Sequence, residues 1–112
     1  MSNVIEEMEK AHPETFSEFK RIQQAQYELF CKKMYDYGEH NITLGLDLTI
    51  PENTNLSISA IIIRVNDKVQ RLFNLVLRKK TNPQNESVED AFKDTSIYCI
   101  IAQIVCNKKW GK

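Results

Sequence analysis

The sequence predicts an all-α protein: a compact bundle of three to four helices, with an ordered loop between the second and third helices. Apolar residues recur every three or four positions over several long segments, which is the period of one helix face. Proline and glycine are few, three of each, and most fall between those segments. Domains usually hold about 100 to 150 residues. We therefore expect one helical domain over residues 1–112.

The first two predicted helices are separated by a proline. Residues 2–11 can form a short amphipathic helix, and Pro13 ends it because proline cannot donate a helical hydrogen bond; residues 1–12 are thus a short N-terminal segment. A longer helix is predicted from Glu14 to Tyr37, with Gly38 as its stop. Its apolar positions are Phe16, Phe19, Tyr27, Phe30, Met34 and Tyr37.

An ordered loop is predicted from Glu39 to Thr54, where glycine, proline and asparagine interrupt the helical period. Its apolar residues alternate with polar ones, which is typical of a short extended segment. These alternating residues are Leu44, Leu46, Leu48 and Ile50.

Two further helices are predicted in the second half of the chain. The third runs from about Leu56 to Lys80, and its apolar residues are spaced 4, 3, 4, 3 and 4 apart, which suits packing on other helices. They are Ile58, Ile62, Val65, Val69, Leu72 and Val76. After a turn at Pro83, Asn85 can cap a last helix that reaches about Trp110. The segment IYCIIAQIVC is apolar nearly all round, so this helix is either central or also makes a subunit contact.

The amino-acid composition argues against some classes of function and indicates where in the cell the protein is expected. Basic and acidic residues number 15 each, which argues against wrapping DNA or RNA. No stretch approaches about 18 apolar residues and the start carries acids, so we expect no membrane segment and a cytoplasmic protein. The three cysteines form no CxxC pair and are expected to be reduced and at least half-buried: Cys31, Cys99 and Cys106. A chain of this size gains from further burial, so a homo-oligomer is expected.

A basic cluster on the third helix is the first candidate site. Arg64, Asp67, Lys68 and Arg71 lie about one turn apart and share a face next to the apolar residues. Arginine presents a fixed fork of donors and lysine a mobile charge, and both suit phosphate oxygens. The alternative is a solvated face on which Asp67 bonds its cationic neighbours.

An acidic cluster on the last helix is the second candidate. Glu86, Asp90, Asp94 and Tyr98 follow one another at intervals of four, with Glu89 close to the same face. Stacked acids repel one another, and a cation or opposing basic residues relieve that repulsion. Mg²⁺ takes carboxylate oxygens together with waters and substrate phosphates. The alternative is an acid-rich first turn that suits the helix dipole, which explains Asp94 poorly.

A third cluster lies where the second helix ends, at Lys33, Asp36, Tyr37 and Asn41 around Gly38. An aromatic ring and an amide there can hold a base or a sugar, although an ordinary helix end has the same composition. The chain has no GxxxxGK[ST] loop and no GxGxxG fingerprint, so neither of those two phosphate-binding loops is predicted.

Three segments together resemble the nucleotide modification associated domain family, which is common in phages: KMYDYGEHNITLGLDL, RVNDKVQRLFNLV and ESVEDAFKDTSIYCIIAQI. The resemblance covers about residues 30–106. It implies a relation to the small nucleotide kinase of T-odd phages, which phosphorylates deoxynucleoside monophosphates, and hence work in the cytoplasm of an infected bacterium. By the matching motifs it implicates Arg64, Asp67, Lys68, Arg71, Glu86, Asp90, Asp94 and Tyr98.

The expected function is binding of a phosphorylated nucleotide, with Mg²⁺-assisted phosphoryl transfer. We assign catalytic roles to Asp67, Asp90 and Asp94, and metal binding to Glu86, Asp90 and Asp94. Ligand binding is assigned to Arg64, Lys68, Arg71, Tyr98, Lys33, Asp36, Tyr37 and Asn41.

Three alternatives remain open. The first is a non-catalytic phage sponge that sequesters nucleotide or cyclic-nucleotide defence signals. The second follows from the acidic last helix, which is similar to that of the all-α nucleoside triphosphate pyrophosphohydrolases. Those enzymes carry a further glutamate pair on an earlier helix, and Glu6 and Glu7 lie in a separate segment here. The third is a structural helical oligomer in which the charges only pair with one another.

Overall fold

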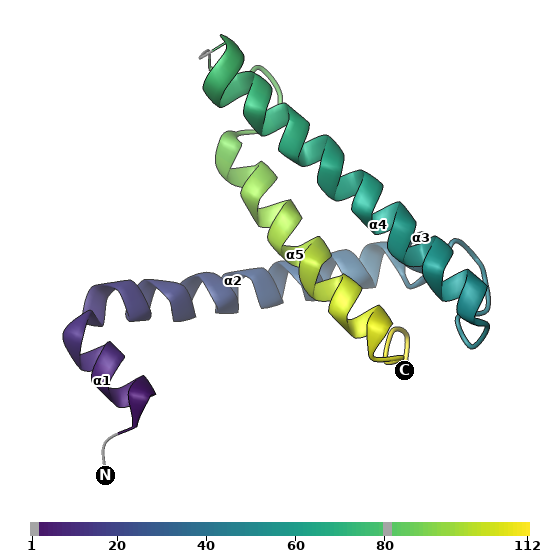
Figure 1. The fold of residues 1–112 in the computed structure, drawn as a ribbon, viewed down its shortest axis with the longest axis horizontal. Helices are drawn as coiled ribbons and strands as arrows, with labels where there is room; N and C mark the ends of the chain where they lie inside the picture. Colours follow the sequence, from purple (N-terminus) through teal and green to yellow (C-terminus); the bar gives the residue numbers. More distant parts are fainter. Residues whose placement is uncertain (1–2, 80–81) are drawn as a thin grey trace. The chain divides into compact units, whose positions relative to one another are not determined.

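The computed structural model describes residues 3–79 and 82–112, and every regular element in those ranges is helical (Figure 1). The all-α prediction is therefore confirmed. The elements are α1 (Val4–Ala11), α2 (Pro13–Tyr37), α3 (His40–Thr43), α4 (Pro51–Leu72), the π-helical segment η1 (Phe73–Lys79) and α5 (Val88–Cys106). None of the helices within these ranges is long and apolar enough to cross a membrane.

The chain divides into two compact units, of which the first ends at Asp36 and the second spans Tyr37–Lys112. In the first unit, the Asn3 side chain accepts a hydrogen bond from the Glu6 amide and caps α1. Helix α2 restarts at Pro13, as the sequence predicts, because the first turn of a helix needs no donor from proline. Neither α1 nor α2 has a buried residue, so the apolar residues of α2 form no core of their own.

In the second unit, α4 and α5 run antiparallel, side by side, as a helical hairpin (Figure 1). Ser57 of α4 is fully buried, and its hydroxyl donates to the Ile42 carbonyl of α3 at 2.6 Å. Trp110 folds back after α5, and its indole donates to the Glu39 carbonyl at 3.1 Å. The buried apolar residues that form the core are Ile42, Ile61, Ala91, Ile97, Ile101, Val105 and Trp110.

The apolar series from Ile58 to Val76 does not form this core. Ile62 is 60% exposed and Val76 is 49% exposed, and the other members are half-buried. The buried positions of α4 are Ser57 and Ile61 instead. The prediction of a helix here is right, but the side that it turns to the core is set by the contacts with α3 and α5.

The segment before α4 differs from the prediction. No extended segment forms at Leu44–Ile50; α3 and a series of turns take its place. Asp47 accepts hydrogen bonds from both the amide and the hydroxyl of Thr49, and such local bonds compete with extended structure. Helix α4 then begins at Pro51 rather than at about residue 56, since proline fits the first helical position.

The last helix also differs at both ends. Its cap is Ser87, whose hydroxyl accepts from the Asp90 amide at 3.0 Å, and not Asn85. It ends at Cys106 rather than near Trp110, because Lys108 has a positive φ of 60° that breaks the helix. The expectation of half-buried cysteines is wrong: Cys31, Cys99 and Cys106 are all exposed.

Candidate functional site

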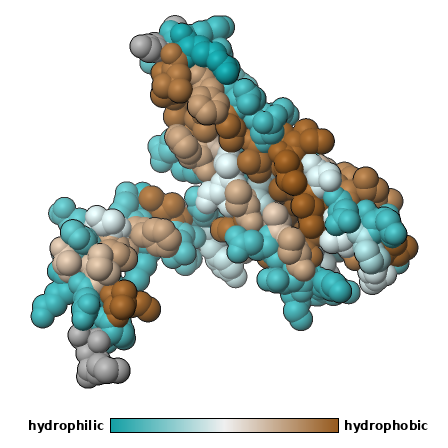
Figure 2. All heavy atoms as spheres, viewed as in Figure 1, coloured by the Kyte–Doolittle hydropathy of each residue, from teal (hydrophilic) through white to brown (hydrophobic). Residues whose placement is uncertain are grey.

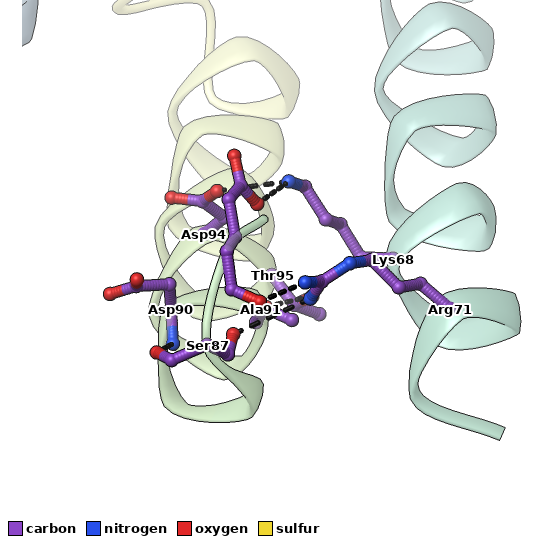
Figure 3. A network of polar contacts seen from close by, with 8 residues as sticks. Lys68, Arg71, Ser87, Asp90, Ala91, Asp94 and Thr95 are labelled. Atoms are coloured by element: carbon purple, nitrogen blue, oxygen red, sulfur yellow. Dashed lines mark hydrogen bonds and ion pairs between the residues drawn. The ribbon is translucent and has the colours of Figure 1, made fainter. Parts of the chain in front are cut away.

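Lys68 is the centre of the candidate site (Figure 3). Its ammonium lies 2.7 Å from Glu86 Oε2 and 3.1 Å from Asp94 Oδ2. The Lys68 and Asp94 side chains are 22% and 19% exposed, and Glu86 is 41% exposed. The hydrogen bond to Glu86, with a smaller contribution from Asp94, raises the pKa of Lys68 against the opposing effect of burial. Residues of the predicted basic and acidic clusters therefore meet at Lys68.

Arg71 of α4 binds the two residues that immediately precede α5. Its guanidinium donates to the carbonyls of Glu86 and Ser87, the latter at 3.4 Å (Figure 3). These two residues come immediately before Val88, the first residue of α5. Since Ser87 also caps α5, the start of that helix is held both by its own cap and by α4.

Arg64 lies on α4 one turn before Lys68 and contacts both α3 and α5. Its Nη2 donates to the Asn41 carbonyl of α3 at 3.1 Å. Its guanidinium carbon also lies 5.7 Å from the centre of the Tyr98 ring on α5, which is a cation–π distance. Arg64, the Tyr98 ring and the backbone of Asn41 thus lie together.

The three residues predicted to bind metal occupy two different surroundings. Glu86 and Asp94 both face Lys68, whereas the exposed carboxylate of Asp90 points away from that lysine (Figure 3). Across the described residues, no group of three or more His, Cys, Asp or Glu side chains is placed to hold a metal ion. The ammonium of Lys68 lies within 3.1 Å of both the Glu86 and the Asp94 carboxylates and offsets the repulsion between them.

The remaining predicted residues are exposed. Asp67 lies on α4 next to Lys68 in the sequence, and its side chain reaches solvent. Lys33 and Asp36 belong to α2 in the first unit, whereas Tyr37 and Asn41 belong to the second unit. Tyr37 is 68% exposed, and Asn41 takes part in the site through its carbonyl rather than its amide side chain.

A hollow of about 460 Å³ lies elsewhere in the second unit and was not predicted. It lies between the α3 region and the segment that follows α5, and its lining includes His40, Asp47, Lys108 and Trp110. Hydrogen bonds from Thr49, together with the charge of Lys112, lower the pKa of Asp47. Sequence reasoning missed this hollow because its two sides are about 60 residues apart in the chain; the lone tryptophan was the available signal.

No protein-family model matches the chain, and comparisons with curated proteins and with solved structures find no significant match. The resemblance to the nucleotide modification associated domain family therefore rests on its motif residues alone.

Proposed function

We propose that the protein binds the phosphate groups of a nucleotide on one side of the α4–α5 hairpin, at a site formed by Arg64, Lys68, Arg71, Asp90, Asp94 and Tyr98. One observation carries the proposal. Three cations on successive turns of α4 lie against α5 and the residues that precede it, within bonding distance of Tyr98, Glu86 and Asp94. Cationic side chains held in place in this way are suited to phosphate oxygens.

The cations retain donors for a ligand. A guanidinium has five N–H groups and an ammonium has three. Arg64 donates through Nη2 to Asn41, and Lys68 bonds two carboxylates, so N–H groups remain on both side chains. The carboxylates beside them repel a phosphate, and a divalent cation carried in with the nucleotide offsets that repulsion.

The residues fit Mg²⁺ only in part, because Glu86 and Asp94 already hold Lys68. The proposal therefore gives Asp90 the direct or water-mediated contact with an ion that arrives with the phosphates. When bound, the ion would neutralise phosphate charge. Arg64 and Arg71 would position the phosphoryl groups, and Asp67 would orient Lys68. The proposed reaction, phosphoryl transfer of the nucleoside monophosphate kinase type, follows from the resemblance.

A second candidate is binding without turnover, as in a sponge for nucleotide or cyclic-nucleotide signals. The ion pairs of Glu86 and Asp94 with Lys68 favour this candidate, because they engage two of the three carboxylates predicted to bind metal. Binding needs only the cations, whereas a transfer reaction needs the reacting groups aligned and their charge offset.

The test is incubation of the purified chain with nucleosides, nucleoside mono-, di- and triphosphates, and cyclic dinucleotides, with and without Mg²⁺. Melting temperature and reaction products are then measured. The proposal expects phosphorylated ligands to raise the melting temperature and unphosphorylated nucleosides to leave it unchanged. Transfer of phosphate supports the kinase reaction, release of pyrophosphate supports the pyrophosphohydrolase alternative, and recovery of intact ligand supports the sponge. No shift with any ligand contradicts the proposal and favours the structural oligomer.

A further inference from the structure

The α4–α5 hairpin carries two apolar series of the same spacing, which together we call the apolar face. On α4 the series is Ile58, Ile62, Val65, Val69 and Leu72. On α5 it is Val88, Phe92, Thr95, Cys99, Ala102 and Cys106, of which Thr95 is the one polar member, with its hydroxyl bonded to the Ala91 carbonyl. Both follow steps of four and three residues. None of these side chains is charged and none is buried, although charged residues make up 27% of the chain.

Both series lie on the same side of the hairpin. Val65 and Val69 directly follow Arg64 and Lys68, which reach toward α5, and Cys99 directly follows Tyr98, which faces α4. Each next residue lies about 100° further round its helix. The two helices face each other and run in opposite directions. A rotation of about 100° about each axis, taken in the direction of the chain, therefore brings both series to the same side of the hairpin. Figure 2 shows hydrophobic side chains along the hairpin on the side turned toward the viewer.

We propose that a second copy of this chain covers the apolar face, so that two α4–α5 hairpins form a four-helix bundle. The alternating steps of four and three residues are those of helices packed nearly antiparallel with interlocking side chains. The two series have matching spacing and nearly equal length, so the face is complementary to its own copy. A two-fold dimer requires such self-complementarity.

The charge and the exposure of the apolar face are consistent with a second copy of the chain as its partner. Because the apolar face contains no charged residue, two copies meet on it without opposing like charges. Ile62 is 60% exposed, Phe92 is 59% exposed, and the other members are at least partly exposed. A standard stable interface takes about 800 Å² and about 20 to 30 residues per partner, so the apolar face would form the centre of such an interface. In the described part of the second unit the core holds seven buried apolar residues, so this unit gains from further burial.

The test is the mass of the full chain by sedimentation equilibrium, with two matched variants. Ile62→Asp places a charge within the apolar face. Ile63→Asp changes a neighbour of the same type and exposure, 62% against 60%, that precedes Arg64 and so points to the other side. We expect a species of about twice 13.1 kDa for the wild type and for Ile63→Asp. For Ile62→Asp we expect dimer affinity to fall by about 30-fold or more. A monomeric wild type, or equal effects of both variants, would overturn the proposal.

Thiol alkylation, followed by mass spectrometry, separates a second copy from a segment of the same chain. We expect Cys99 and Cys106 to be protected increasingly as protein concentration rises, and to react fast in Ile62→Asp at every concentration. Protection that is independent of concentration means that the same chain covers the face, which contradicts the proposal. The inference does not depend on nucleotide binding, so the two proposals can fail separately.

Discussion

Replacing Lys68 with methionine removes the ammonium that joins two carboxylates and retains a side chain of similar length. Glu86 and Asp94 then lose their shared partner, at distances of 2.7 and 3.1 Å. Exposed ion pairs contribute about 0.2 to 1 kcal/mol, and breaking a fully buried pair costs about 3 to 5 kcal/mol. With side chains that are 22% and 19% exposed for Lys68 and Asp94, and a more exposed Glu86, we expect an intermediate loss of about 1 to 2 kcal/mol.

The assay is thermal unfolding followed by circular dichroism, with urea unfolding as a second measure. For a domain the size of the second unit, the melting temperature should fall by roughly 5 to 15 °C. Lys93→Met is the matched control. Lys93 pairs with the exposed Glu89 at 3.6 Å, so this change should alter stability by less than about 0.5 kcal/mol. Equal losses for Lys68→Met and Lys93→Met would refute the claim that Lys68 joins α4 to α5 and the residues before it.

Three further outcomes follow from the same contacts. Ser57→Ala removes the buried hydroxyl that bonds the Ile42 carbonyl, so unfolding free energy should fall by about 1 to 3 kcal/mol, whereas exposed Ser59→Ala should have little effect. Ser87→Ala removes the cap of α5 and should cost about 1 kcal/mol, with Ser87→Asp retaining most of the stability; equal losses for both would contradict the capping role. Because the pKa of Lys68 is raised above its usual 10.5 in the folded state, its contribution is complete below pH 10.5 and is lost as pH rises through the folded pKa. The stability difference between wild type and Lys68→Met should thus stay constant from pH 7 to about 10 and shrink at higher pH, as measured by urea unfolding; a difference that shrinks between pH 7 and 9 would contradict this.

Helix positions were predictable because they depend on local patterns. The period of three to four residues located α2, α4 and α5, and Pro13 and Gly38 marked real helix ends. The core was less predictable because burial depends on which side of a helix meets its neighbour. The sequence favours Ile58 and Ile62 as core residues of α4, but the contacts with α3 and α5 bury Ser57 and Ile61 instead.

The candidate site was likewise only partly predictable from the sequence. Spacing placed Lys68 and Asp94 on the correct faces of their helices, and the structure brings them to 3.1 Å. Spacing did not show that Asp94 lies beside Lys68, because that depends on how α4 and α5 are aligned along each other. Nor did it show that Arg71 binds main-chain carbonyls, since every residue has a carbonyl and none leaves a signal in the sequence.

The central claim, that phosphate binds to the cations of α4, is tested most directly by isothermal titration calorimetry with the four deoxynucleoside monophosphates and Mg²⁺. Wild type is compared with an Arg64→Gln, Arg71→Gln double variant. The control is Arg78→Gln, which changes an arginine of η1 that lies over the Phe73 ring at 6.0 Å. Hydrogen bonds to charged groups contribute about 1.5 to 3 kcal/mol, so affinity should fall at least about 10-fold in the double variant and stay unchanged in Arg78→Gln. Circular dichroism checks that all three proteins are folded. Equal affinity in folded wild type and double variant, or no heat with any of the nucleotides, contradicts the account.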